Sequence, residues 1–252
     1  MEIIILGSGT GVISLKRGSP GYLMRTQKAK LLIDSGTGTL HQMIRHGINP
    51  TDIDAIFYTH THPDHICDLV PFLFSLKYTE PHRTHPLSIF GGPGFKGFFE
   101  KLTEVYLGWI TPQTFALNVI EMKGSLIHFL DMSVRAVPVV HNPESVAYRF
   151  EESQYSAAFS GDSDMCDGLV EVAKESDIYF IECSFPDQNK KRGHLTASEV
   201  AHVACLAKPK KLVLTHIYPQ NDNVSILNDI KKDYDGEVIL AMDNMIFKND
   251  DM

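Results

Sequence analysis

The sequence predicts an α/β protein in which helices cover two β-sheets. Short apolar runs of the kind that form strands recur along the chain, and several follow one another too closely for a helix to connect them. Other runs are separated by segments with apolar residues three and four positions apart, the spacing of an amphipathic helix. Hydrophobic residues make up 43% of the 252 residues, so the chain can bury a large core. No stretch has the composition of a linker, and we expect a single domain over residues 1–252.

The strongest helix signal is Thr196-Ala197-Ser198-Glu199, where the Thr hydroxyl and the Glu carboxylate can cap each other's backbone amides before an apolar face. We expect helices over Thr196 to Leu206, Thr39 to His46, Phe95 to Tyr106 and Cys166 to Lys174. The predicted strands are Ile3 to Leu6, Lys30 to Ile33, Ala55 to Tyr58, Leu87 to Phe90, Val134 to Val140, Val146 to Phe150, Ser156 to Ser160, Ile178 to Ile181, Leu212 to Thr215 and Val238 to Met242.

Composition and charge argue against several classes of protein. The net charge of −8 disfavours a broad nucleic-acid-binding face, although it is compatible with a local basic pocket. The first residues form an apolar run without a basic leader, and this run is too short for a signal peptide or a membrane span. The four cysteines have neither C-x-x-C spacing nor the density of a disulfide scaffold. We therefore expect a cytoplasmic protein with reduced thiols and no membrane partner.

One short segment concentrates metal-binding side chains. His60, His62, Asp64 and His65 follow directly after a predicted strand. The period-two spacing points the first two histidines the same way, and Pro63 forces a turn that can bring the other two side chains to a second ion. A single histidine would more often be an ordinary polar residue. Three histidines and an aspartate at a strand end gain nothing as core, and zinc favours this mixture of nitrogen and oxygen ligands, so the cluster predicts a metal site.

Two metal ions need more ligands than this segment offers, and three side chains elsewhere can supply them. His141, Asp162 and His216 each stand at the end of a predicted strand or just after it. Imidazole and carboxylate groups are competent ligands for such ions. The sequence therefore predicts a ligand set drawn from several strands.

These motifs together resemble the metallo-β-lactamase superfamily, and within it most closely the ribonuclease Z branch. The likeness lies in T-H-x-H-x-D-H, an isolated strand-end histidine, a Gly-Asp pair and a late L-T-H, and it runs along most of the chain. Further matches to the ribonuclease Z branch are Leu6 to Gly11, Leu31 to Gly36, Phe90 to Gly94, and Glu182 followed by His194 to Ala197.

The resemblance implies a four-layer αββα sandwich with two metal ions at one edge, between the sheets. It assigns one ion to His60, His62 and His141 and the other to Asp64, His65 and His216, with Asp162 bridging both. Two zinc ions are expected, although manganese or iron would suit the same ligands. A hydroxide held between the ions would attack the substrate, and the remaining positive charge would attract an anionic phosphodiester.

The resemblance also implies the catalytic residues. In ribonuclease Z-like enzymes the histidine of the H-x-T-A segment protonates the leaving oxygen or stabilises the phosphoryl oxygens, and a strand-end glutamate orients it. His194 and Glu182 hold these places here, and an imidazole pKa near neutrality suits the role. Without the resemblance, His194 would read equally well as part of a solvent-facing loop. The family treats the aspartate that matches Asp64 as a ligand and a possible general base.

Other segments near these motifs carry further expectations. Gly7 to Gly11 lacks the G-x-G-x-x-G spacing of a dinucleotide site, and we expect a tight turn between strands there. Asp34 is expected to tie the loop near the metals through hydrogen bonds. Lys190 to Arg192 is our candidate for gripping substrate phosphates. Pro81 to His85 and Tyr106 to Trp109 are candidates for lining the substrate cleft.

The chain departs from ribonuclease Z in two places. That enzyme often carries a long arm for the elbow of transfer RNA between the strand-end histidine and the Gly-Asp pair. Here the interval from His141 to Asp162 reads as one hairpin. Ile217 to Gln220 stands where the family tends to have a serine-rich segment ending in Arg-Tyr, so one phosphate contact is in doubt. Both departures weaken transfer RNA as the expected substrate.

The leading hypothesis is a dinuclear metal-dependent hydrolase, a phosphodiesterase of the ribonuclease Z-like group that acts on a nucleic-acid end, such as an RNA end, or on a small cyclic or alkyl phosphodiester. One alternative is a hydrolase of carboxylic esters, lactones or sulfate esters on the same fold. Another is a metal-containing binding or carrier protein of a cofactor pathway. A homodimer is common among similar proteins, but the sequence does not determine the oligomeric state.

Overall fold

Two seven-stranded sheets face each other in the computed structural model, which describes residues 1–222 and 225–249. The first sheet has the strand order β14-β1-β2-β3-β4-β5-β6, and the second has the order β13-β12-β11-β10-β9-β8-β7. The strands of the first sheet are β1 (Glu2–Gly7), β2 (Gly21–Arg25), β3 (Lys30–Ser35), β4 (Ala55–Phe57), β5 (Leu87–Gly91), β6 (Leu117–Glu121) and β14 (Ile246–Lys248). Those of the second are β7 (Leu126–Phe129), β8 (Met132–Pro138), β9 (Val146–Glu152), β10 (Tyr155–Phe159), β11 (Ile178–Glu182), β12 (Lys211–Thr215) and β13 (Glu237–Leu240).

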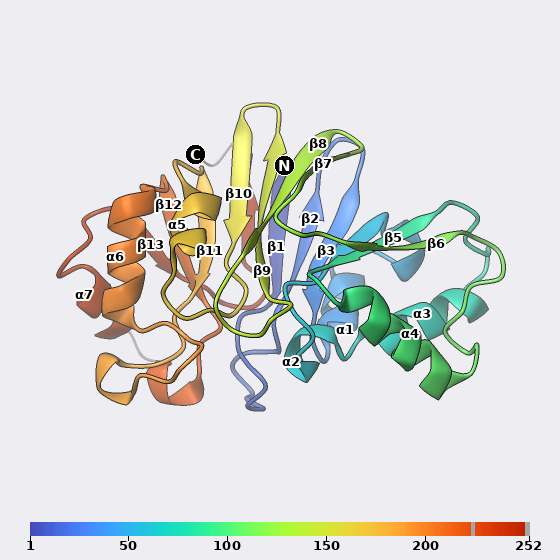
Figure 1. Cartoon of the computed structure of the whole chain (residues 1–252), viewed down its shortest axis with the longest axis horizontal. Helices are drawn as coiled ribbons and strands as arrows, with labels where there is room; N and C mark the ends of the chain where they lie inside the picture. The colour runs from blue at the N-terminus through green and yellow to red at the C-terminus, as the bar shows by residue number, and fades with distance from the viewer. Residues whose placement is uncertain (223–224, 250–252) are drawn as a thin grey trace.

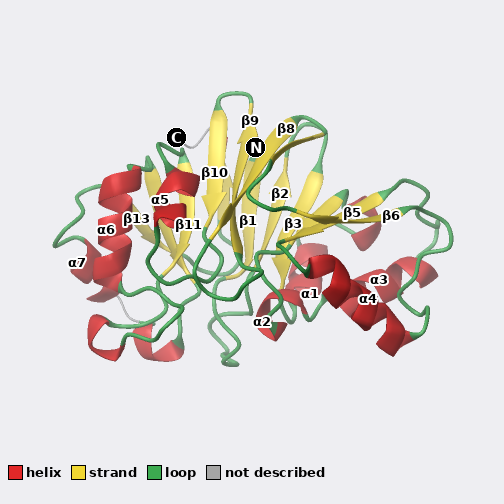
Figure 2. Cartoon of the chain, viewed as in Figure 1, coloured by secondary structure: helices red, strands yellow, loops and turns green. Residues whose placement is uncertain are grey.

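Helices cover the outer faces of both sheets, as Figures 1 and 2 show. The first sheet carries α1 (Thr39–Arg45), α3 (Leu69–Tyr78) and α4 (Phe95–Tyr106), and the second carries α5 (Asp167–Ala173), α6 (Ala197–Ala207) and α7 (Ser225–Ile230). The short helix α2 (Pro63–Ile66) and the 3-10 turns η1 (Pro50–Asp52), η2 (Asp187–Asn189) and η3 (Pro219–Asn221) complete the described elements. The predicted four-layer αββα sandwich is confirmed.

Three hydrophobic cores hold these layers together. Aromatic rings dominate the core between the sheets, where Phe57 stacks on Phe90 with ring centroids 4.3 Å apart and Phe159 stacks on Phe180 at 4.8 Å. The other two cores lie between each sheet and its helices. Because the central strands are buried on both faces, their sequences read as continuous apolar runs rather than as alternating patterns.

The strand directions bring the predicted site residues to one edge of the sandwich. Strands β3 to β6 run parallel to one another, as do β10 to β13. Strand β8 runs in the same direction as β10, because both are antiparallel to β9. The carboxyl ends of β8 and of β10 to β12 therefore meet at one edge of the second sheet, and the chain after β4 leads into α2 at the lower edge in Figure 1.

All the predicted strands and helices are present, with shifted ends. Helix α4 begins and ends at the expected residues, and α6 begins at the expected capping box of Thr196 and Glu199. Strand β8 ends at Pro138 rather than Val140, because Val140 has left the sheet and pairs only with Asp164 in an isolated bridge. The prediction of a tight turn after Gly7 is wrong. Residues 8–20 form a long loop that returns against Gly7, where a Cβ would lie 1.9 Å from the Ser19 carbonyl oxygen.

Candidate functional site

The site begins where β4 ends and the chain turns into α2. The backbone of His62 is extended, and Pro63 occupies the first position of the helix, where its missing N–H costs no hydrogen bond. His60 therefore lies on the extended stretch, while Asp64 and His65 lie on the first turn of the helix. The expected turn at Pro63 is present.

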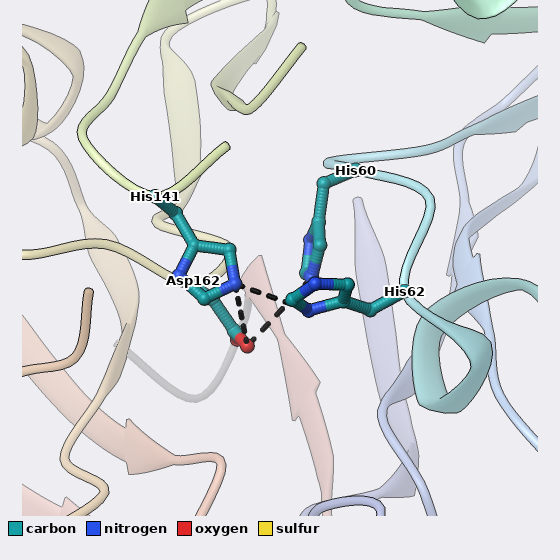
Figure 3. Close-up of side chains that lie close together, drawn as sticks. All are labelled: His60, His62, His141 and Asp162. Carbon is teal, nitrogen blue, oxygen red and sulfur yellow. Dashed lines mark hydrogen bonds and ion pairs between the residues drawn. The ribbon is translucent and has the colours of Figure 1, made fainter. Parts of the chain in front are cut away.

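Four of the predicted ligands form one group between the two sheets (Figure 3). His60 and His62 approach from the segment after β4, and His141 and Asp162 approach from the second sheet. One potential ligand atom from each of the four lies within 4.8 Å of the others. The Nδ1 atom of His62 lies 3.1 Å from Nε2 of His141, as close as one ion or one proton between two imidazoles requires.

The remaining predicted ligands form a second group next to the first. Ligand atoms of Asp64, His65 and His216 also lie within 4.8 Å of one another. Asp64 Oδ2 is 3.5 Å from Nε2 of His216 and 3.9 Å from Nε2 of His65. The structure thus brings all seven predicted side chains to one place.

Asp162 lies between the two groups and faces both. Its Oδ1 is 3.3 Å from Nε2 of His65, and its Oδ2 is 3.3 Å from Nε2 of His216. The same Oδ2 lies 3.7 Å from Nε2 of His60 and 3.9 Å from Nε2 of His141. This carboxylate has the position that a bridging ligand needs.

Hydrogen bonds from outside the two groups fix the tautomers of several histidines. Asp34 accepts hydrogen bonds from the backbone N–H and hydroxyl of Thr59 at 2.8 and 2.9 Å, and from Nδ1 of His65 at 2.7 Å. Asp34 therefore ties the loop as expected and leaves Nε2 of His65 free to bind an ion. His141 donates from Nδ1 to the Gly193 carbonyl at 2.8 Å, which leaves its Nε2 free, and the side-chain amide of Asn142 lies 2.9 Å from Nε2 of His62.

The proposed proton donor lies beside the two groups. His194 Nδ1 is 3.3 Å from both carboxylate oxygens of Glu182 and 3.9 Å from Asp162 Oδ2. Glu182 is fully buried and also accepts hydrogen bonds from the backbone of Ser163 and Leu195. It is therefore placed to hold the His194 ring.

Ser184 is a participant that the sequence did not indicate. Its hydroxyl lies 2.5 Å from Glu182 Oε2 and 2.9 Å from Nδ1 of His216. The serine is fully buried and follows β11 by two residues. Glu182 thus contacts a predicted ligand through Ser184 and the proposed proton donor directly.

Burial and neighbouring charges set the protonation of the site. Burial, with help from His65, holds the pKa of His60 well below its usual value. Burial would also lower the pKa of His65, but Asp162 and Asp34 raise it well above the usual range. Burial would raise the pKa of Asp162, yet His216 and His65 hold it well below normal. The centre therefore combines a neutral imidazole with an ionised carboxylate, as a metal ligand set requires.

The pKa of His194 is shifted in the opposite direction from that of His60. Burial lowers its pKa, but the hydrogen bond and the charge of Glu182 outweigh burial and raise the pKa above its usual value. The charge of Asp162 acts in the same direction. A histidine that holds its proton near neutral pH can donate that proton to a leaving oxygen.

The donor atoms themselves fit divalent cations. Among the described residues, Nε2 of His60, His65 and His216 and Oδ1 of Asp162 are buried without a hydrogen-bond partner. Buried polar atoms are nearly always paired, and leaving one unpaired costs about 1–3 kcal/mol. An ion within each group would satisfy these atoms, and the nitrogen and oxygen ligands are those that zinc accepts.

Two of the minor expectations do not hold, and a third fails for Lys190, while Lys191 and Arg192 stay candidates for contacting substrate phosphates. Lys190 binds Asp164, Glu199 and the His194 carbonyl, so this lysine fastens the His194 loop instead of projecting towards a substrate. Residues 81–85 precede β5, and residues 106–109 follow the end of α4, which starts beyond the carboxyl end of β5. Both segments therefore lie away from the carboxyl edge that bears the ligands, and neither lines the site.

Ile217 to Gln220, the segment after His216 that departs from the ribonuclease Z pattern, contributes to an aromatic wall beside the site. Tyr218 stacks on Phe185 with ring centroids 4.5 Å apart and lies 5.6 Å from the ring of His216. Its ring also lies 6.0 Å from that of His194. This wall borders the His194 side of the centre.

No helix within residues 1–222 and 225–249 combines the length and the apolar character needed to cross a bilayer.

Comparisons with known proteins agree with this architecture. A ribonuclease Z of Myxococcus xanthus is 27% identical over an alignment that covers 96% of each chain. An uncharacterized protein of Mycobacterium tuberculosis is 28% identical over 94% of this chain and 88% of its own. The solved structure of YhfI from Bacillus subtilis, described as a metallo-β-lactamase fold protein, has a TM-score of 0.86 with 22% identity and covers 98% of both chains. The model of the β-lactamase superfamily domain matches residues 29–217, and the chain therefore belongs to the β-lactamase superfamily.

Proposed function

We propose that this protein is a metal-dependent hydrolase that cleaves a small phosphodiester at a dinuclear centre. One observation carries the proposal: two groups of buried and half-buried ligands meet at Asp162, and the His194–Glu182 pair lies beside that carboxylate. A paired metal centre with an adjacent proton donor suits in-line attack of water on phosphorus. Relatives named ribonuclease Z support the same class of reaction.

Different residues of the site have different roles in the proposed reaction. Divalent cations, when bound to the two groups, supply an activated water and offset the negative charge of the phosphate. Asp64 lies beside His65 and His216 and is placed to accept a proton from the attacking water. Burial would raise its pKa, but His216 and His65 lower it, so the carboxylate is ionised and can accept a proton. His194 is placed to protonate the leaving oxygen, and Glu182 holds its ring.

The structure favours a substrate smaller than transfer RNA. The interval from His141 to Asp162 contains the β9–β10 hairpin and no room for a long arm. The alignment with the Myxococcus ribonuclease Z spans 300 positions, more than the chain's own 252 residues, so that enzyme has segments without a counterpart here. The mycobacterial relative aligns over 256 residues, close to the length of this chain. The net charge of −8 also disfavours a long nucleic acid.

Turnover of bis(p-nitrophenyl) phosphate tests the proposal. The chain loaded with zinc or manganese should hydrolyse this diester, and His60→Ala should reduce kcat/KM by more than about a hundredfold because a ligand is lost. His128→Ala is the matched control, since this histidine is exposed on β7 and should leave the rate unchanged. Absence of turnover in the loaded wild type, with His60→Ala indistinguishable from it, would contradict the proposal.

The same preparation separates the alternatives. Faster turnover of a thioester, a lactone or an aryl sulfate than of the phosphodiester would favour a different hydrolase on this fold. Tight binding of a small molecule without turnover would favour a carrier protein. Zinc is our proposed metal, and elemental analysis of the purified protein for zinc, manganese and iron tests it. We further propose a cytoplasmic homodimer, for which localisation of a tagged chain and light scattering are the measurements.

A further inference from the structure

His194, the proposed proton donor, lies on a loop that connects β11 to α6. Residues 190–195 of this loop belong to neither a helix nor a strand. The His194 ring contacts Glu182 at 3.3 Å, which is slightly longer than most hydrogen bonds of this type. The place of the ring therefore depends on how the loop backbone is fixed as well as on Glu182.

One lysine of this loop turns inward and joins it to its surroundings. The Nζ atom of Lys190 donates to Asp164 Oδ1 at 2.8 Å, to the His194 carbonyl at 2.6 Å and to a carboxylate oxygen of Glu199. An ammonium group has three donors, and these contacts use all of them. The Lys190 side chain is 30% exposed, whereas the next two residues of the basic run are exposed. Lys190 therefore connects the loop to the chain after β10 and to the first turn of α6.

The carboxylate that receives Lys190 also holds the loop backbone against a proposed metal ligand. Asp164 Oδ2 accepts the backbone N–H of Gly193 at 2.9 Å, and the Gly193 carbonyl accepts the Nδ1 proton of His141 at 2.8 Å. Gly193 has a φ of +84°, and a Cβ there would lie 2.8 Å from Nδ1 of His141, so this contact requires glycine. Lys190, Asp164 and Gly193 thus form one path of contacts from the His194 loop to His141.

The Asp164 end of this path is fixed by the second sheet. The backbone N–H of Asp164 donates to the Val140 carbonyl at 2.7 Å, which joins the two segments that carry His141 and Asp162. The loop is therefore anchored on segments that supply ligands. Removal of the lysine would free the His194 backbone from this anchor, while the contacts that the ligands make elsewhere would remain.

We propose that Lys190 is a positioning residue that holds His194 at the place from which it can reach the leaving oxygen. The inference rests on the proposed phosphodiesterase function. In that reaction a water oxygen bonds to phosphorus, and Asp64 takes the proton that the water loses. The bond from phosphorus to the leaving oxygen breaks, its electron pair stays on that oxygen, and His194 gives the oxygen a proton. Lys190 touches none of the reacting atoms and acts only through His194.

Two esters that differ in their leaving group test the proposal. The p-nitrophenolate ion leaves phosphorus readily without a proton, whereas phenolate leaves much faster when it is protonated. In the metal-loaded chain, Lys190→Met should lower kcat for methyl phenyl phosphate about tenfold and change kcat for methyl p-nitrophenyl phosphate by less than about twofold. KM should stay at the wild-type value for both esters, because Lys190 does not contact the substrate. A general loss of structure would lower kcat for both esters alike.

Three further variants serve as references. Lys190→Arg keeps a cation with several donors and should restore most of kcat for the phenyl ester. His194→Ala should show the same selectivity with a larger loss, about a hundredfold for the phenyl ester. Lys232→Met removes an exposed ion pair with Asp229 and should leave kcat for both esters unchanged.

Limited proteolysis gives a readout that needs neither metal nor turnover. Trypsin cleaves after lysine and arginine, and Lys191 and Arg192 lie in this loop. Cleavage requires local opening of the backbone. Lys190→Met should speed cleavage after these two residues by about fivefold or more. Cleavage after Lys28, in the turn between β2 and β3, should keep the wild-type rate and shows that the rest of the fold is intact.

Wild-type rates of cleavage in Lys190→Met would show that Lys190 does not hold the loop and would overturn the inference. Faster cleavage with equal losses of kcat for the two esters, or with none, would show that the loop does not position His194 and would overturn it as well. Failure of the loaded wild type to hydrolyse either ester would instead contradict the proposed function. The cleavage rates would then decide by themselves whether Lys190 holds the loop.

Discussion

A single hydroxyl joins two parts of the site that act on different atoms. The Ser184 hydroxyl has one proton, and its shortest contact, 2.5 Å to Glu182 Oε2, identifies the carboxylate as the acceptor. The hydroxyl oxygen then accepts the proton on Nδ1 of His216 at 2.9 Å. This chain of hydrogen bonds leaves Nε2 of His216 bare towards Asp64 and Asp162. Ser184 therefore selects the tautomer in which His216 can bind an ion.

Removal of that hydroxyl should weaken metal binding more than it weakens folding. We expect Ser184→Ala to reduce zinc affinity about tenfold and to lower kcat with it, because groups that orient metal ligands typically contribute 10- to 100-fold. Ser184→Thr keeps the hydroxyl and should restore most of the affinity. Competition with a zinc-chelating dye measures the affinity directly.

Ser176 offers a matched control for this experiment. It is equally buried, and within the described chain its hydroxyl has no hydrogen-bond partner. Ser176→Ala should leave zinc affinity and kcat as in the wild type. If Ser184→Ala also binds zinc like the wild type, the tautomer of His216 is set by something other than Ser184.

The contrast between Ser184 and the histidines shows how far single residues can be interpreted from sequence. The sequence identifies His60 and His62 as candidate metal ligands because neither a buried core nor an exposed surface explains their spacing. Ser184 and Asn142 are ordinary polar residues, and their partners come from segments that meet only in the folded sandwich. Their roles depend on distances between strands, which no local pattern contains.

At the scale of elements, Asp177 fastens the connection from α5 into β11. Its Oδ2 accepts hydrogen bonds from the backbone N–H and hydroxyl of Ser156 at 2.7 and 2.9 Å, and its Oδ1 lies 2.7 Å from Nζ of Lys210. The contacts join β10, β11 and the segment before β12. Burial would raise the pKa of Asp177, but Lys210 and Ser156 outweigh burial and lower it.

Asp177→Asn should destabilise the protein by about 1–3 kcal/mol at pH 7, since a charged acceptor of several hydrogen bonds is lost. A carboxylate whose pKa is lowered by folding stabilises the protein above its unfolded pKa, near 4, and loses this effect as the pH falls through the folded pKa. The difference between wild type and variant should therefore shrink below about pH 4. Urea unfolding at several pH values measures it.

The exposed Asp235 serves as the reference for that series. Asp235→Asn should change the unfolding free energy by less than about 0.5 kcal/mol at every pH. A constant difference between Asp177→Asn and wild type from pH 3 to 7 would show that the charge of Asp177 is not the source of its contribution.

The elements missing from the sequence-based prediction share a physical cause. Helix α3 has the sequence LVPFLFSLKY, and its apolar residues lie on every side with no polar face between them. Pro71 is its third residue and reads as a helix breaker, although proline is tolerated in the first turn. Strands β6, β7 and β14 lie at sheet edges and are partly exposed, so their sequences lack the continuous apolar run of the central strands. The pairing that makes these segments regular comes from neighbouring strands.

For the whole molecule, the packed layers raise the stability of the fold, whereas the crowded ligand groups lower it. Apolar cores on both faces of each sheet stabilise the sandwich independently of any ion. At the ligand edge, buried imidazoles and carboxylates are crowded together, and several of their atoms lack partners among the described residues. The fold therefore supplies the stability that the crowded ligand groups lower, and bound cations should return it.

Metal removal should consequently lower thermal stability without unfolding the protein at room temperature. Each cation present at a hundred times its Kd would stabilise the folded state by about 2.7 kcal/mol, which for a chain of this length corresponds to roughly 5 to 10 °C in Tm for each bound ion. Differential scanning calorimetry of the chelated and zinc-loaded chain measures this shift. His60→Ala should lose most of it, and His128→Ala, at an exposed position on β7, should retain it in full. Equal Tm values for the chelated and loaded wild type would show that the seven side chains do not act together as a metal centre.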